Sequence, residues 1–364
     1  MSRDDGTSYL LTETQLRAWL DELIADDWQL VAPVVDAGPP RFEPVTHAGQ
    51  VALDAAPGPP TRWSAKEYLL PRQETLLHYA ASGAGVEITA PPADARPRVL
   101  FGLAPCDAAG LQRLAATFET GPGDPYFQAR RQSTAIVSLA CRAAGPMCFC
   151  TAVGGSPGGQ GGSDVQLLAV QIQGESGFIL RPLTDKGARL VEASSDAWSA
   201  CSPELEASAE QRLRQVEETI SRETLPAATP GLLEQGFDDE VWQELADPCL
   251  GCRVCTMVCP SCSCFDVYDE GTAACGQRCR CWDGCTQALF TAHATGHNPR
   301  PTQAARLRQR VMHKFSYFPS EHAGRSMCVG CGRCAVSCPA GLDLHQTVMR
   351  VLERTASAEG AGHA

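Results

Sequence analysis

The sequence predicts an α+β protein, with an N-terminal α/β region and a helical, cysteine-rich C-terminal domain. Two observations support this prediction. Two short apolar runs, residues 98–103 and 134–139, flank a segment with helical spacing, which is the pattern of a βαβ unit in a partly parallel sheet. A cysteine motif then occurs twice near the C-terminus. A chain of 364 residues is long enough for about two domains, and we place them at 1–235 and 236–354, followed by a flexible tail at 355–364.

The elements of the N-terminal region follow from periodicity and capping signals. A capping box at Thr12 to Gln15 starts a helix that continues to Asp26, and the Pro- and Gly-containing residues 223–236 are interpreted as an interdomain linker. Residues 37–62 are expected to be mostly irregular. The other predicted elements are strands at 29–35, 50–53, 98–103, 134–139, 165–171 and 178–183, and helices at 108–118, 186–193 and 208–220.

The composition limits both location and partners. The chain has 19 cysteines, yet its opening residues lack the apolar segment of a secretory signal, so we expect a cytoplasmic protein with reduced thiols. No window of 18 apolar residues is present to span a membrane. The net charge of −12 argues against a general nucleic-acid binder. Residues 271–350 nevertheless hold ten Arg or Lys against three acids, either as a solvated helix face or as counter-charge for something anionic.

The two cysteine motifs have the spacing of bacterial ferredoxins, CxxCxxCxxxCP. Three thiolates spaced in this way wrap around one 4Fe-4S cluster, and the fourth cysteine reaches the other cluster. One site is therefore assigned to Cys249, Cys252, Cys255 and Cys338, and the second to Cys328, Cys331, Cys334 and Cys259. Zinc or unliganded thiols are the alternatives, although zinc sites usually show two CxxC pairs.

The distance between the motifs favours the α-helical ferredoxin type. Cys249 and Cys328 are 79 residues apart, and segments with helical spacing at 286–294 and 302–315 lie between them. A compact β-hairpin ferredoxin would leave no room for these helices. Arg306, Arg310 and other basic residues then lie near the clusters in sequence, which favours the counter-charge interpretation. The basic helix face at 306–314 is also a candidate docking site for an acidic partner.

Four further cysteines are expected at one edge of the N-terminal sheet, because the carboxyl ends of parallel strands meet at the same edge. These are Cys106, Cys141, Cys148 and Cys150. Four convergent thiolates suit a third cluster, whereas buried core cysteines are the alternative. Six more cysteines lie outside these three sets: Cys262, Cys264, Cys275, Cys279, Cys281 and Cys285. We expect them to be structural or redox-inert thiols, and a further cluster or a zinc site is the alternative.

Taken together, these motifs resemble the iron-sulfur β subunit of cytosolic NAD(P)-dependent NiFe hydrogenases, the sulfhydrogenases, and its relative, the electron-transfer subunit of anaerobic sulfite reductase. The matching strings are 66–71 (KEYLLP), 105–107 (PCD), 124–126 (DPY), 130–131 (RR), 148–150 (CFC), 259–264 (CPSCSC), 280–285 (RCWDGC), 296–300 (GHNPR) and 328–334 (CVGCGRC). Cys275, Cys279 and Cys281 depart from the usual pattern. The likeness covers most of the chain and favours the third cluster at Cys106, Cys141, Cys148 and Cys150.

The resemblance implies an iron-sulfur protein that relays electrons between two partners. One partner is a NiFe hydrogenase, made of a small and a large subunit, and the other is a flavin- and NAD(P)-binding reductase subunit. A sirohaem sulfite reductase is the alternative partner. No catalytic residue is expected, since no GxGxxG, GxxxxGK[ST], HExxH or GxSxG motif occurs. Two other classes of function stay open at this point: a catalytic iron-sulfur subunit with an open coordination position, and a zinc-bound scaffold.

Overall fold

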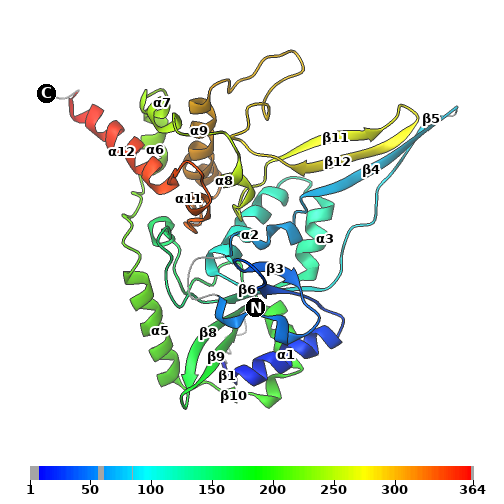
Figure 1. The fold of residues 1–364 in the computed structure, drawn as a ribbon, viewed down its shortest axis with the longest axis vertical. Coiled ribbons are helices and arrows are strands. Elements are labelled where there is room, and N and C mark those ends of the chain that lie inside the picture. Colours follow the sequence, from blue (N-terminus) through cyan, green and yellow to red (C-terminus); the bar gives the residue numbers. More distant parts are fainter. Residues whose placement is uncertain (1–7, 56–60, 84, 362–364) are drawn as a thin grey trace.

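The computed structural model describes residues 8–55, 61–83 and 85–361. Figure 1 shows a body built on a large sheet, a group of helices beside it that ends at the C-terminus, and a long β arm that projects from the body. No helix within the described ranges is long and apolar enough to cross a membrane.

The body is an eight-stranded mixed sheet in the order β10-β1-β9-β8-β7-β6-β2-β3. The four central strands β2, β6, β7 and β8 are parallel to one another. The pairs at either side of them, β2 with β3 and β8 with β9, are antiparallel. The predicted parallel pairing across the βαβ unit is therefore confirmed. The strands are β1 (Tyr9–Thr12), β2 (Gln29–Val34), β3 (Arg41–Pro44), β6 (Arg98–Leu103), β7 (Thr134–Leu139), β8 (Val165–Ile172), β9 (Glu175–Pro182) and β10 (Ser199–Ala200).

Helices cover both faces of this sheet, which explains why its central strands read as continuous apolar runs. On β6, Val99 and Phe101 belong to one hydrophobic cluster, while Leu100 and Leu103 belong to another on the opposite face. Helices α1 and α4 contribute to the first cluster, and α2 and α3 to the second. The bounds are α1 (Glu13–Ala25), α2 (Pro105–Phe118), α3 (Pro125–Ser133), α4 (Asp185–Glu192) and α5 (Pro203–Glu218), the last of which packs on β8.

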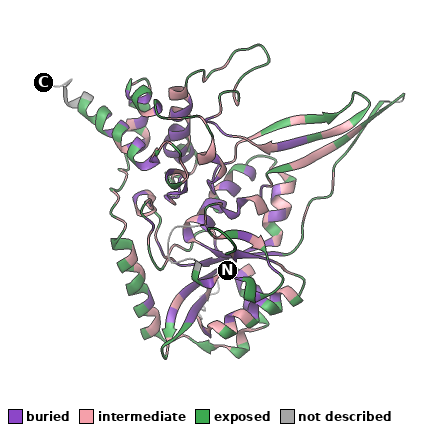
Figure 2. Cartoon of the chain, viewed as in Figure 1, coloured by how far each residue is buried: buried purple, intermediate pink, exposed green. Residues whose placement is uncertain are grey.

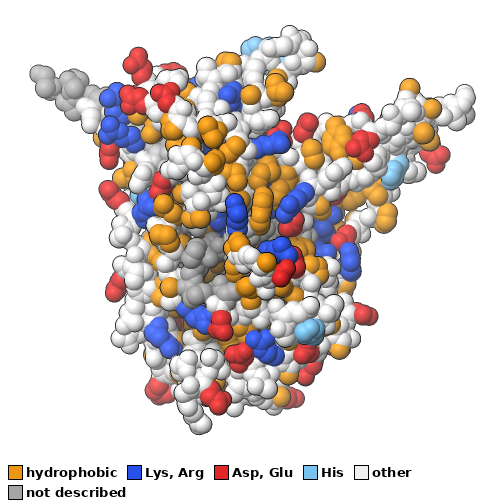
Figure 3. All heavy atoms as spheres, in the orientation of Figure 1, with side chains coloured by type: hydrophobic (Ala, Val, Ile, Leu, Met, Phe, Trp, Pro, Cys, Tyr) orange, Lys and Arg blue, Asp and Glu red, His pale blue; other side chains and the backbone are white. Residues whose placement is uncertain are grey.

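The arm is a four-stranded antiparallel sheet that the sequence analysis does not predict. Its order is β11-β12-β4-β5, so strands from the two predicted domains share one sheet. The arm is mostly exposed, as Figure 2 shows, and hydrophobic side chains lie along it in Figure 3. Its strands carry the exposed side chains of Val86, Ile88 and Val267. The strands are β4 (Gln73–Ser82), β5 (Gly85–Thr89), β11 (Phe265–Gly271) and β12 (Cys275–Trp282).

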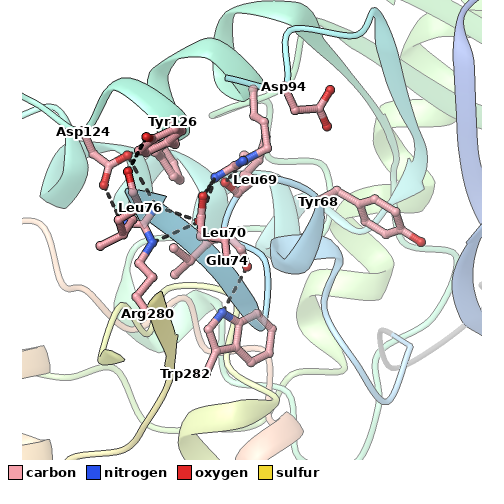
Figure 4. Close-up of polar contacts among 12 residues, drawn as sticks. Tyr68, Leu69, Leu70, Glu74, Leu76, Asp94, Asp124, Tyr126, Arg280 and Trp282 are labelled. Carbon is pink, nitrogen blue, oxygen red and sulfur yellow. Dashed lines mark hydrogen bonds and ion pairs between the residues drawn. The ribbon is translucent and has the colours of Figure 1, made fainter. Parts of the chain in front are cut away.

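A buried ion network fixes the base of the arm to the body (Figure 4). Arg280 of β12 pairs with Glu74 of β4 at 2.8 Å and with Asp124, which caps helix α3. Arg130 of α3 pairs with the same Glu74 at 2.8 Å. Trp282 adds an indole hydrogen bond of 3.0 Å to the carbonyl oxygen of Leu70. Because these charges are largely buried and mutually paired, the arm leaves the body at a fixed point.

The C-terminal helices pack around a third hydrophobic cluster that also takes Phe149 and Ala152 from the N-terminal region. The predicted domains thus share a core cluster as well as the arm. The predicted helix at 302–315 is confirmed as α9, which continues into a π-helical turn. The elements are α6 (Thr229–Gln235), α7 (Val241–Ala246), α8 (Val254–Met257), α9 (Gln303–Met312), the π turn His313–Tyr317, α10 (Phe318–Glu321), α11 (Arg333–Val336) and α12 (Leu344–Ala361).

Several local predictions are wrong. Residues 286–294 form turns, not a helix, and the strand predicted at 50–53 is replaced by short 3-10 turns, Ala48–Gln50 and Leu53–Ala55. The segment 37–62 contains β3, and its residues 56–60 lie outside the described residues. Helix α6 lies within the predicted linker. Helix α12 continues to Ala361, so the predicted tail at 355–364 is helical as far as that residue, and its residues 362–364 lie outside the described residues.

Candidate metal centre

The two cysteine motifs adopt the same local backbone. Gly251 and Gly330 occupy equivalent positions, with φ of 63° and 65°, and Arg253 and Gly332 both have left-handed φ angles just before a short helix. These turns let three thiols of each motif curl around one point. The amide of Gly330 donates to the Cys328 sulfur at 3.5 Å, which shows backbone N–H groups turned toward the thiols. The two short helices that follow, α8 and α11, pack against each other.

The fourth cysteine of each motif lies with the other motif, as the crossed assignment expects. Cys338 lies near Cys249 and, with Cys249, Cys252 and Cys255, lines one pocket. Cys259 is near Cys328, Cys331 and Cys334. The structure therefore brings together the two predicted sets of four, and their ligation of iron stays a prediction.

Burial makes these thiols poor anions unless a cation compensates them. Burial raises the pKa of Cys334 to about 12, while Arg310 lowers it. Arg310 and Lys314 are both buried, and the Lys314 ammonium lies 3.5 Å from the Cys259 sulfur. The basic stretch is therefore not a solvated face: Arg306, Arg310 and Lys314 point inward, so the idea that this face docks an acidic partner is wrong, and the counter-charge interpretation fits.

The N-terminal cysteines also converge. Cys106 is in the first turn of α2, Cys141 follows β7, and Cys148 and Cys150 lie in the next loop. Cys141 lies near Cys150, Cys148 and Cys106. Burial raises the pKa of Cys141 to about 12 and that of Cys150 to about 11. Cys106 and Cys150 line a cavity of about 320 Å³ together with the glycine-rich loop at 154–161.

This quartet of Cys106, Cys141, Cys148 and Cys150 adjoins the second ferredoxin motif. The amide of Phe149 donates to the carbonyl oxygen of Gly330 at 2.8 Å, and Cys106 is near Cys331. Close by, Arg333 and Asp107 form an ion pair of 2.5 Å in which both side chains are at most 2 % exposed. Burial lowers the pKa of Arg333, whereas Asp107 and Cys331 raise it by more. The quartet and the second motif are therefore one continuous structure.

The remaining cysteines fall into two groups. Cys262, Cys264 and Cys285 gather at the base of the arm near Lys66. The others lie apart from them: Cys201 beside β10, and Cys275, Cys279 and Cys281 along β12. The sequence analysis did not predict that the charged side chains of Lys66, Asp107 and Arg333 lie buried beside the thiols. The only sequence signal for them was that they lie in the strings KEYLLP, PCD and CGRC, which match the family.

The residues present fit iron-sulfur clusters. They offer soft thiolate donors, amide N–H groups directed at sulfur, and buried cations to balance a cluster's negative charge. The amide group of Gln303 adds a further hydrogen bond of 3.2 Å to the Cys249 sulfur. In the described part of the chain, no group of three or more His, Cys, Asp or Glu side chains is arranged to hold a metal ion.

Comparison with known proteins agrees with this chemistry. A family model for a 4Fe-4S dicluster domain matches residues 248–342, which include both cysteine motifs. The β subunit of sulfhydrogenase 2 from Pyrococcus furiosus is 31% identical over 308 residues, covering 83% of this chain and 86% of that protein. The similarity thus extends beyond the dicluster segment into the α/β body.

Proposed function

The chain belongs to the family of sulfhydrogenase β subunits and is an iron-sulfur electron-transfer subunit; on that premise we propose that it relays electrons between a NiFe hydrogenase and a flavin- and NAD(P)-binding subunit in the cytoplasm. The relay uses two 4Fe-4S clusters on the eight cysteines of the ferredoxin motifs. A third cluster is held by Cys106, Cys141, Cys148 and Cys150.

The observation that carries this proposal is the continuity of the three cysteine sites. Cys106 lies near Cys331 of the second motif, and Cys334 lies near Cys255 of the first. Electrons can pass from one cluster to the next only when neighbouring clusters lie close together, and this arrangement of the cysteines meets that requirement. Clusters supply electron storage, and the protein supplies ligation, burial and hydrogen bonds that set their potentials over a span of roughly −700 to +450 mV.

The residues around the thiols hold the sites and balance their charge. Arg310 and Lys314 are buried between the two motifs and compensate the negative charge of thiolate-bound iron. The buried Arg333–Asp107 pair fixes the second motif against helix α2, which carries Cys106. No residue of this arrangement is assigned to bond making, so the hydride and hydrogen chemistry belongs to the partners.

Anaerobic affinity purification from the native host tests the proposal. The co-purifying proteins are identified by mass spectrometry, and their nickel and flavin are measured. We expect a nickel-containing hydrogenase large subunit, its small subunit, and also a flavoprotein. A sirohaem protein without nickel would overturn the hydrogenase assignment and make this chain the electron-entry subunit of a sulfite reductase.

The third cluster needs a separate test. In the anaerobically purified chain, Cys148→Ser together with Cys150→Ser is expected to remove about four irons. Cys201→Ser is the control, because Cys201 lies apart from all these sites. Full iron content in the double variant would leave only the dicluster relay.

A further inference from the structure

A separate group of thiols lies at the base of the arm, outside both ferredoxin motifs. Cys262 and Cys264 precede β11, and Cys285 follows β12. Phe265 pairs with Trp282 at the start of this hairpin, and the amide of Asp283 donates to the carbonyl oxygen of Cys264 at 3.0 Å. The thiols of Cys264 and Cys285 are thereby brought close together. Hairpin pairing, not local spacing, therefore assembles the site.

Cys262 completes the group. Its thiol lies near that of Cys264, and both Cys262 and Cys285 are buried. On its other side Cys262 lies beside Cys259, which is assigned to the second ferredoxin cluster. Cys285 lies near Cys255, which is assigned to the first. The three thiols thus adjoin both predicted clusters without belonging to either set of four.

Three buried cations surround these thiols. Arg310 lies 3.7 Å from the Cys262 sulfur, and Lys314 donates to Ser261 at 3.2 Å beside the Cys259 sulfur. Lys66 donates to the Cys262 carbonyl oxygen at 3.0 Å. Each of the three side chains is at most 3 % exposed, and none of them forms an ion pair with a carboxylate among the residues that the structure describes.

Lys66 lies beside this group and also near Cys259 of the second ferredoxin site. It comes from the N-terminal region, in the 3-10 turn Ala65–Tyr68, and its ammonium lies 4.1 Å from the centre of the Trp282 ring. Burial lowers its pKa, whereas the thiols of Cys262, Cys259 and Cys264 raise it, with Cys262 having the largest effect. A buried ammonium without an anion is costly. An anionic group on Cys262, Cys264 and Cys285 would supply that anion.

We propose that Cys262, Cys264 and Cys285 hold an additional iron-sulfur cluster, in which one iron carries a ligand other than cysteine and Lys66 provides the counter-charge. The proposal rests on the iron-sulfur chemistry of the proposed function and extends the relay toward the base of the arm.

The test compares Cys264→Ser and Cys285→Ser with Cys279→Ser in the anaerobically purified full chain. Cys279 is the matched control because it is also buried on the hairpin but lies outside the group. Iron, acid-labile sulfide and zinc are measured per chain. We expect each site variant to lose about three to four irons with matching sulfide, and the control to lose none. Unchanged iron, or about one zinc per wild-type chain at this site, would overturn the proposal.

A second variant covers the case in which the serine substitutions disturb folding. Lys66→Gln keeps every thiol and removes one positive charge, so we expect one cluster signal in a redox titration followed by electron paramagnetic resonance to shift to lower potential. The other signals should shift less, with the second ferredoxin cluster next in size because Lys66 also lies near Cys259. Identical midpoints for all signals would overturn the role of Lys66.

Failure of this inference differs from failure of the proposed function. Cys331→Ser should remove iron from the second ferredoxin site whether or not the additional cluster exists. Iron loss in Cys331→Ser without loss in Cys264→Ser or Cys285→Ser would therefore refute only the additional cluster. A wild-type chain without iron would refute both.

Discussion

The C-terminal dicluster segment and the N-terminal quartet place cysteines together by different means. In the dicluster segment, short loops with left-handed residues at fixed positions bring thiols together within a few residues. In the quartet, Cys106 follows strand β6 and Cys141 follows strand β7, and these two strands are parallel neighbours in the sheet. Cys148 and Cys150 lie in the loop that follows β7. The first site depends on spacing and the second on a folded body.

This contrast also concerns what stabilises each region. The sheet has hydrophobic clusters on both faces, and none of the side chains in these clusters is a cysteine. The cysteine loops have short helices of four residues and few buried apolar side chains of their own. Metal binding is therefore expected to contribute more to the folding of the dicluster segment than to that of the body.

Removal of iron gives the largest expected effect. Anaerobic chelation should destabilise local structure at residues 249–262 and 328–338 by more than about 5 kcal/mol, because ligand binding and folding are coupled there. Strands β6 and β7 should keep their protection. Amide hydrogen exchange measured by mass spectrometry on the holo and apo chain distinguishes the two regions. Equal loss of protection in the strands and the loops would contradict the comparison.

The buried ion pair that joins the regions is the next target. Asp107→Asn removes the carboxylate from Arg333 and leaves a buried guanidinium without its anion, which should cost about 3–5 kcal/mol of unfolding free energy. The midpoint of anaerobic denaturant unfolding measures this. Asp269→Asn is the control, because its pair with Arg278 is exposed and should leave the midpoint unchanged. A similar midpoint for both variants would show that the pair does not join the regions.

The same contrast decides what the sequence could predict. Repeated spacing predicts the dicluster ligands directly, and apolar runs predict β6 and β7, because each signal is local. The arm was missed since β4 and β12 lie about two hundred residues apart and pair through long-range contacts. The segment 286–294 has apolar residues at helical spacing but forms turns, so periodicity alone was not sufficient to predict a helix there. The counter-charges at Lys66 and Arg333 depend on tertiary contacts that spacing does not encode.

Close packing between the regions gives a smaller effect. At Gly330 an added Cβ would lie 2.5 Å from the Cys150 Cα, whereas at Gly341 nothing lies within 4 Å, and both residues have φ near +65°. Gly330→Ala should therefore cost about 2–4 kcal/mol, from strained backbone plus a steric clash, and Gly341→Ala about 1 kcal/mol from backbone alone. The midpoints of denaturant unfolding measure the difference in stability between the two variants. Equal losses of stability would show that the loops with Gly330 and Cys150 can move apart without a free-energy cost.

The smallest effect is a pH dependence that belongs to the C-terminal helices. Burial, followed by Lys314 and Arg310, lowers the pKa of His313 from 6.5 to about 4 in the folded chain. Below pH 6.5 the unfolded chain binds a proton that the folded chain does not, so stability falls as pH decreases from 6.5 toward 4. Between pH 7 and 5 this loss is about 2 kcal/mol. His313→Gln should lose less stability over that range, by this amount, in denaturant unfolding. The exposed His78→Gln should retain the wild-type pH dependence, and if His313→Gln also retained it, the imidazole would not be the group responsible.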